Sequence, residues 1–101
     1  MALETQLSAD EKSFTIKMDE KFDFGKVQDF RQSYTDMPDS VKQIEVNLSD
    51  TEYMDSSALG MLLNMQKTLK DSVSTFKITH CRPQVLKILT ISRFDKKFDI
   101  Q

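Results

Sequence analysis

The chain has 101 residues, of which 39% are hydrophobic, and its 14 basic and 16 acidic side chains give a formal net charge of −2. This length suits one compact domain, and we expect a single domain over residues 1–101. The small acidic excess argues against nucleic acid as a partner, because no surplus of basic residues is present to displace its counterions. No apolar run approaches the about 20 residues of a membrane span, so we expect no membrane partner.

Cysteine and histidine usage limits the possible location and cofactors. Cys81 is the only cysteine, and the start of the chain lacks the basic and apolar regions of a secretion signal. We therefore expect a cytoplasmic protein. One histidine and one cysteine form no cluster for a zinc site, and no glycine-rich loop is present to hold a nucleotide. We expect a monomer without metal or cofactor.

The first part of the chain contains strand and helix patterns. Residues 3–7 predict a short edge strand, and residues 14–18 alternate between apolar and polar types, as in a half-buried strand. A loop is expected over residues 19–25. Apolar residues then recur every three or four positions over 27–37, which predicts an amphipathic helix ending near Pro38.

The remainder of the chain continues the alternation. Strands are predicted over residues 43–48, 75–80 and 98–100, and helices over 56–71 and 83–92. Strands that alternate with helices indicate right-handed crossovers between parallel strands. The predicted fold is therefore α/β, with a mixed, mainly parallel central sheet of four to five strands and helices packed mostly on one face.

The most distinctive segment is residues 53–60, Tyr-Met-Asp-Ser-Ser-Ala-Leu-Gly, where a strand gives way to a helix. Asp55 is suited to be the N-cap, since its carboxylate can accept hydrogen bonds from the first turn. Ser56 would then be the first helical residue. The unpaired N–H groups and the dipole at a helix start favour negative charge, so the fold tolerates a phosphoryl group of about −1.5 to −2 charges on Ser56. A partner docked on the same surface would meet that new charge.

Residues 55–60 resemble the Asp-Ser-Ser/Thr-Gly-Leu-Gly signature of STAS domains, the anti-sigma factor antagonists. The resemblance extends over nearly the whole chain. Residues 22–24 match the family's acidic loop between the second strand and the first helix. Residues 81–85 resemble the turn from the fourth strand into the third helix, and residues 89–94 resemble the segment before the last strand.

The resemblance implies a partner-switch function. The unphosphorylated protein would bind an anti-sigma factor or related regulator with serine kinase activity, and would thereby free that regulator's target. The kinase would phosphorylate Ser56, with Asp55 orienting the hydroxyl, and a PP2C-type phosphatase would reverse the step. Two features depart from the family. Ala58 replaces the usual glycine, where its methyl group could alter which partner fits, and the chain reaches Gln101 without the C-terminal helix of many members.

Other interpretations of the serines remain open. Ser56 could only form local hydrogen bonds at the helix start, and the domain could be a constitutive interaction module that is never phosphorylated. Ser57 is expected to order the turn and is the alternative acceptor. An enzyme with Ser56 as nucleophile would need a base within reach, but the only histidine, His80, is expected to be partly buried on another strand. We therefore expect no catalytic residue and no enzyme activity.

Partner contacts are expected in two places. Asp23 either caps a helix that starts near Gly25 or contacts a partner beside Ser56, together with the neighbouring aromatic Phe24. A second candidate surface is a stripe of methionines around Ala58. The stripe belongs either to the core or, in part, to an exposed partner surface, because a core face is already supplied by Leu59, Leu62, Leu63 and Leu69. Its members are Met54, Met61 and Met65.

Overall fold

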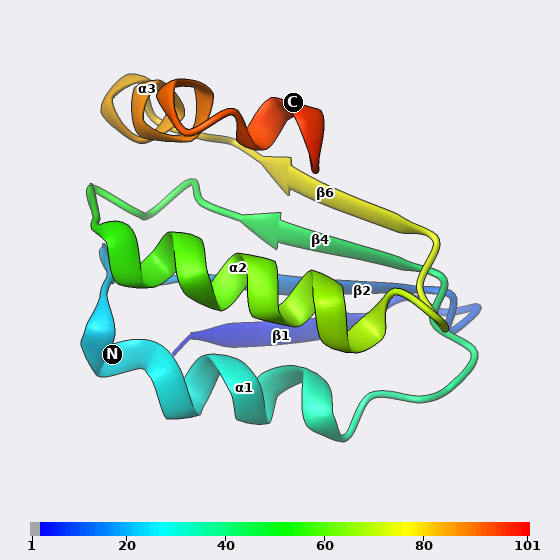
Figure 1. The fold of residues 1–101 in the computed structure, drawn as a ribbon. Helices are drawn as coiled ribbons and strands as arrows, with labels where there is room; N and C mark the ends of the chain where they lie inside the picture. Colours follow the sequence, from blue (N-terminus) through cyan, green and yellow to red (C-terminus); the bar gives the residue numbers. More distant parts are fainter. Residues whose placement is uncertain (1–2) are drawn as a thin grey trace.

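A five-stranded sheet of order β1-β2-β4-β6-β7 forms the centre of the computed structural model, which describes residues 3–101 (Figure 1). Its strands are β1 (Glu4–Leu7), β2 (Ser13–Lys17), β4 (Gln43–Asn47), β6 (Thr75–Thr79) and β7 (Asp99–Ile100). β1 pairs antiparallel with β2, whereas all other neighbours in this sheet are parallel. The predicted mixed, mainly parallel sheet is therefore confirmed, with β1 at the predicted edge.

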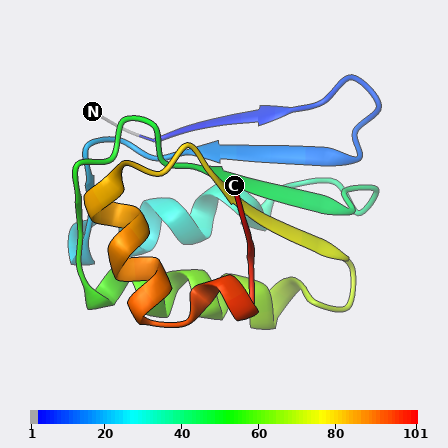
Figure 2. The ribbon, with the colours of Figure 1, turned by 90° about the horizontal axis from the view of Figure 1, so that it is seen from above.

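Three α-helices cover one side of this sheet (Figures 1 and 2). They are α1 (Val27–Thr35), α2 (Ser56–Leu69) and α3 (Pro83–Ile91). Two short 3-10 helices, η1 (Phe24–Lys26) and η2 (Phe94–Lys96), precede α1 and follow α3. The prediction of helices on one face is confirmed, although α1 and α2 each end two residues before the predicted positions.

The alternation of residue types along the strands explains why only one face is covered. Each central strand directs apolar side chains toward the helices and polar side chains toward the open face. The buried apolar members in β2, β4 and β6 are Phe14, Ile16, Ile44, Val46, Phe76 and Ile78. The core therefore lies between the sheet and the helices.

A separate two-stranded parallel ribbon lies outside the main sheet. It consists of β3 (Lys21–Phe22) and β5 (Tyr53–Met54). The sequence prediction placed a loop over residues 19–25 and thus missed β3, whereas η1 lies where one interpretation of Asp23 predicted a helix starting near Gly25. The ribbon connects the segment before α1 with the segment before α2.

The prediction for His80 is wrong. The residue follows β6 directly and its φ angle is 59°, which lies in the left-handed region, and its side chain is exposed. A left-handed residue ends the extended geometry of the strand, so the alternation that runs through Phe76 and Ile78 does not continue to His80.

Candidate functional site

Asp55 caps α2, as its position in the sequence predicts. Its backbone is extended, and its Oδ1 accepts hydrogen bonds from the backbone N–H groups of Ser57 at 2.9 Å and Ala58 at 3.4 Å. The Ser57 amide, which has no helical partner, is thereby satisfied, and the Ala58 amide also donates to the backbone oxygen of Asp55 at 3.1 Å. The carboxylate is therefore held against the first turn of α2, and it fixes the point at which the helix begins with Ser56.

The two candidate acceptor serines differ in exposure. Ser56 is the first residue of α2 and is exposed, whereas Ser57 is only partly exposed. Within the described residues 3–101, the hydroxyls of Ser56 and Ser57 form no side-chain hydrogen bond, with His80 or with any other group. Because Ser56 is exposed, a modifying enzyme can approach it from solvent.

Ala58 lies inside the fold. Its side chain is fully buried, so the methyl group that replaces the family's glycine packs in the core. The expectation that this methyl group faces a partner is therefore wrong. The physical reason is the helix period, because residue 58 lies on the same buried face of α2 as Met61 and Leu62.

The β3–β5 ribbon brings the Asp23 loop to the start of α2. Phe22 pairs with Met54 in a parallel register, and both side chains are buried. Because parallel strands leave a ribbon at the same end, residues 23–24 emerge beside residues 55–56. Two segments that are about thirty positions apart in the sequence thus contribute to one surface.

Asp23 has a defined structural role in this surface. Its Oδ1 accepts a hydrogen bond from the backbone N–H of Gly25 at 3.0 Å, which makes it the N-cap of η1. The capping interpretation of Asp23 is confirmed. The cap holds the turn in which the neighbouring residue, Phe24, projects into solvent.

Two aromatic side chains flank the Ser56 region. Phe24 is 76% exposed and Tyr53 is 51% exposed. Tyr53 lies in the outer row of the ribbon opposite Lys21 and was not identified from the sequence. Only the pairing register could have indicated it, because a two-residue strand has no readable alternation. Exposed aromatic side chains are typical anchors of protein interfaces.

The methionines do not belong to this surface. The exposed fractions of Met54, Met61 and Met65 are 4%, 9% and 0%, so the expectation of a partly exposed stripe is wrong. The core-facing stripe of α2 contains methionines together with Leu62, and the expected core leucines Leu59 and Leu69 are partly buried against the core. Leu63, which was expected to be in the core, is 37% exposed instead.

In residues 3–101, no group of three or more histidine, cysteine or acidic side chains is arranged to hold a metal ion. None of the helices in that range has the length and apolar character needed to span a bilayer.

Comparisons with known proteins give consistent results. Residues 5–100 match the family model described as Mlab, STAS domain. A STAS-domain containing protein of Pseudomonas aeruginosa (strain UCBPP-PA14) is 39% identical over 100 residues, which cover 99% of each chain.

Solved structures show the same fold at low sequence identity. The unphosphorylated form of the anti-sigma factor antagonist SpoIIAA matches with a TM-score of 0.70 at 18% identity, over 89% of this chain and 83% of that one. An anti-sigma factor antagonist from Mycobacterium paratuberculosis matches with a TM-score of 0.74 at 17% identity, over 98% and 85% of the two chains. At these identities the structural similarity concerns the fold.

Proposed function

Because this chain belongs to the STAS domain family, we propose that it is a partner-switch regulator controlled by phosphorylation of Ser56. In its unphosphorylated state it binds an anti-sigma factor or a related regulator with serine kinase activity. Phosphorylation releases the regulator, and a PP2C-type phosphatase restores binding. The observation that carries this proposal is the exposed Ser56 at the start of α2, at the end of the β3–β5 ribbon from which the exposed Phe24 also emerges. In this role the domain acts by binding, without catalysis, in the cytoplasm.

The local electrostatics support a modification that the fold tolerates. A phosphate on Ser56 would meet the positive end of α2, an interaction that typically contributes about 0.3–1 kcal/mol. The carboxylate of Asp55 is engaged by the amides of Ser57 and Ala58, and its like charge directs the phosphate outward. The free energy of unfolding should therefore change little.

A docked partner would respond differently to the same charge. Desolvation of an imperfectly paired charge in an interface costs several kcal/mol, and about 1.4 kcal/mol corresponds to a tenfold change in affinity. Phosphorylation should consequently weaken regulator binding by orders of magnitude. Phe24 and Tyr53 supply the apolar contacts that the regulator would cover.

The test compares Ser56→Ala and Ser56→Asp with the unmodified protein. Affinity capture with mass spectrometry identifies the regulator, and titration then measures its affinity for each variant. Thr68→Asp is the matched control, because Thr68 is exposed on the same helix and the substitution adds the same charge. We expect capture by the unmodified protein, Ser56→Ala and Thr68→Asp, and loss of capture by Ser56→Asp.

Two readouts distinguish the alternatives. Equal regulator affinities for Ser56→Asp and Ser56→Ala would contradict the switch and leave a constitutive interaction module. Phosphopeptide mapping after incubation with the kinase identifies the acceptor, and we expect phosphate on Ser56. Labelling of Ser57 instead would assign the switch to the neighbouring, half-buried hydroxyl. Thermal unfolding of each variant controls for loss of the fold.

A further inference from the structure

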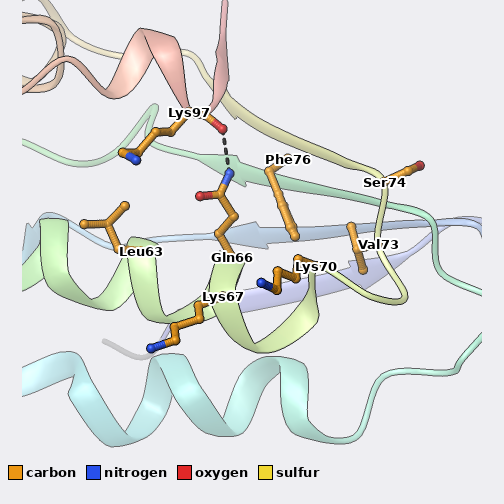
Figure 3. Close-up of a pocket in the computed structure, with 8 residues that line it drawn as sticks. All are labelled: Leu63, Gln66, Lys67, Lys70, Val73, Ser74, Phe76 and Lys97. Atoms are coloured by element: carbon orange, nitrogen blue, oxygen red, sulfur yellow. Dashed lines mark hydrogen bonds between the residues drawn. The ribbon is translucent and has the colours of Figure 1, made fainter.

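A second surface lies along the C-terminal half of α2, away from Ser56. It is a groove of about 570 Å³ between α2, β6 and the segment after η2 (Figure 3). With a rise of about 1.5 Å per residue, Leu63 lies about 10 Å and Lys70 about 21 Å along the helix from Ser56. A ligand of the groove therefore need not cover the proposed phosphorylation site.

The groove has an apolar floor. Val73 and Phe76 line it with side chains that are 3% and 8% exposed, and Leu63 adds a side chain that is 37% exposed. Gln66 connects the two walls, because its Nε2 donates a hydrogen bond to the backbone oxygen of Lys97 at 2.6 Å (Figure 3). This bond fixes the position of the segment after η2 relative to α2, so the groove has a defined width.

The rim of the groove is basic. Lys67 and Lys70 come from the end of α2, and Lys97 comes from the other wall (Figure 3). Among the described residues, those that line the groove include no acidic side chain. In the part of the chain that the structure describes, the ion pairs involve Lys17 and Lys26, so the three rim lysines have no carboxylate partner. This concentration of positive charge contrasts with the net charge of −2 for the whole chain.

Stabilisation of the helix end accounts for only part of this arrangement. Basic side chains in the last turn of a helix interact favourably with its dipole, which explains Lys67 and Lys70. Lys97 does not belong to that helix, yet its side chain lies at the same groove. An apolar floor bordered by cations from two separate elements has the composition of a binding site for an anionic, partly apolar ligand.

We propose that this groove binds a segment of a partner protein in which acidic side chains flank an apolar anchor. The anchor would contact Leu63 and Phe76, and its carboxylates would pair with the rim lysines. Small-molecule sites usually enclose about 70–90% of the ligand surface, whereas an open groove beside a helix covers one face of a peptide. Charge complementarity and this open shape together select an acidic peptide.

The test begins without an assumed peptide sequence. A displayed library of random 12-residue peptides is selected on the full chain and counter-selected on Lys67→Glu/Lys70→Glu. We expect enrichment of peptides with Asp or Glu on both sides of an apolar residue. Synthetic versions are then titrated by fluorescence anisotropy, and amide shifts map the contact. The affinity should fall at least tenfold in Lys67→Glu/Lys70→Glu, and shifts should cluster at Leu63, Val73 and Phe76.

Matched variants separate local from general effects. Lys12→Glu/Lys87→Glu makes the same charge change on exposed lysines outside the groove and should leave the affinity unchanged within twofold. Lys67→Gln/Lys70→Gln gives a milder change if the glutamates impair folding, which thermal unfolding reports. Ser56→Asp should bind the peptide normally, and a loss there would place the contact on the Ser56 face and overturn the proposal.

Three other outcomes would also overturn the proposal. The library could yield no peptide that survives counter-selection, or the control pair could lose as much affinity as the groove pair. Alternatively, dodecanoate could shift the groove amides while no peptide does, which would assign the groove to a small amphiphilic acid. Because none of these readouts uses the regulator of Ser56, they leave the proposed switch function untouched.

Discussion

Asp55 has a structural task that can be measured apart from signalling. Asp55→Ala removes the carboxylate that accepts from the Ser57 amide, while the Ala58 amide keeps the backbone oxygen of residue 55, and we expect the free energy of unfolding to fall by about 1 kcal/mol. Asp55→Ser should retain most of the stability, since serine is also a good N-cap. Urea denaturation of both variants is the measurement. An unchanged unfolding midpoint for Asp55→Ala would show that the cap does not stabilise α2.

Phe24 should contribute to binding without contributing to folding. Its ring is 76% exposed, so Phe24→Ala should change the free energy of unfolding by less than about 0.5 kcal/mol. Loss of an interface anchor typically costs about 2 kcal/mol or more, and we expect regulator affinity to fall at least about tenfold. Ile91→Ala is the control, because Ile91 is 71% exposed on α3. Equal effects of both substitutions would remove the specific role of Phe24.

At the scale of elements, the β3–β5 ribbon depends on a buried hydroxyl. Thr51 is fully buried, and its Oγ1 donates a hydrogen bond to the backbone oxygen of Asp19 at 2.9 Å, which joins the segments before the two strands. Thr51→Val keeps the shape but leaves that oxygen without this donor. We expect a loss of about 1–3 kcal/mol in the free energy of unfolding. Thr68→Val, at an exposed position, should cost much less in the same denaturation experiment.

The strands of the same ribbon are too short to be predicted from the sequence. Segments such as 43–48 and 56–71 are long enough to show a period of two or of 3.6 residues, and both were predicted correctly apart from their ends. A two-residue strand has no period, since it forms only when the chain brings Lys21 and Phe22 beside Tyr53 and Met54. The exposure of Tyr53 therefore could not be predicted from the sequence.

The prediction of a partly exposed methionine stripe was wrong for a different reason. The position of Asp55 as a cap could be predicted because capping depends on local chemistry. Which side of an apolar helix faces the core depends on its neighbours, and in α2 the buried face centres on Met61, Leu62 and Met65. Leucine at position 63 is as hydrophobic as its neighbours but faces the open groove.

For the molecule as a whole, the partly buried thiol of Cys81 and the buried phenol of Tyr34 should make the free energy of unfolding fall in alkaline solution. Burial raises the pKa of Cys81 above its ordinary 9.0 and the pKa of Tyr34 above its ordinary 10.0. The unfolded chain therefore releases both protons at a lower pH than the folded chain does. Their contribution to the free energy of unfolding is complete below about pH 9, and it is lost as pH rises through the folded-state pKa values.

Urea denaturation between about pH 8 and about pH 10.5 measures this dependence. The slope should be smaller in Cys81→Ala and in Tyr34→Phe than in the unmodified protein. Tyr53→Phe is the matched control, because it makes the same substitution at a ring that is half exposed. A slope that both Tyr34→Phe and Cys81→Ala leave unchanged would show that other groups dominate alkaline unfolding.

The two rows of the ribbon have an evolutionary consequence. Phe22 and Met54 face inward and are constrained by the core, whereas Lys21 and Tyr53 face solvent beside Ser56. Surface substitutions usually change the free energy of unfolding by less than about 0.5 kcal/mol, so the outer row can diverge freely after gene duplication. Discrimination between partners can arise from a single repulsive pair. Paralogous domains that share the same core could thus lose binding to each other's regulators through substitutions at only these few positions.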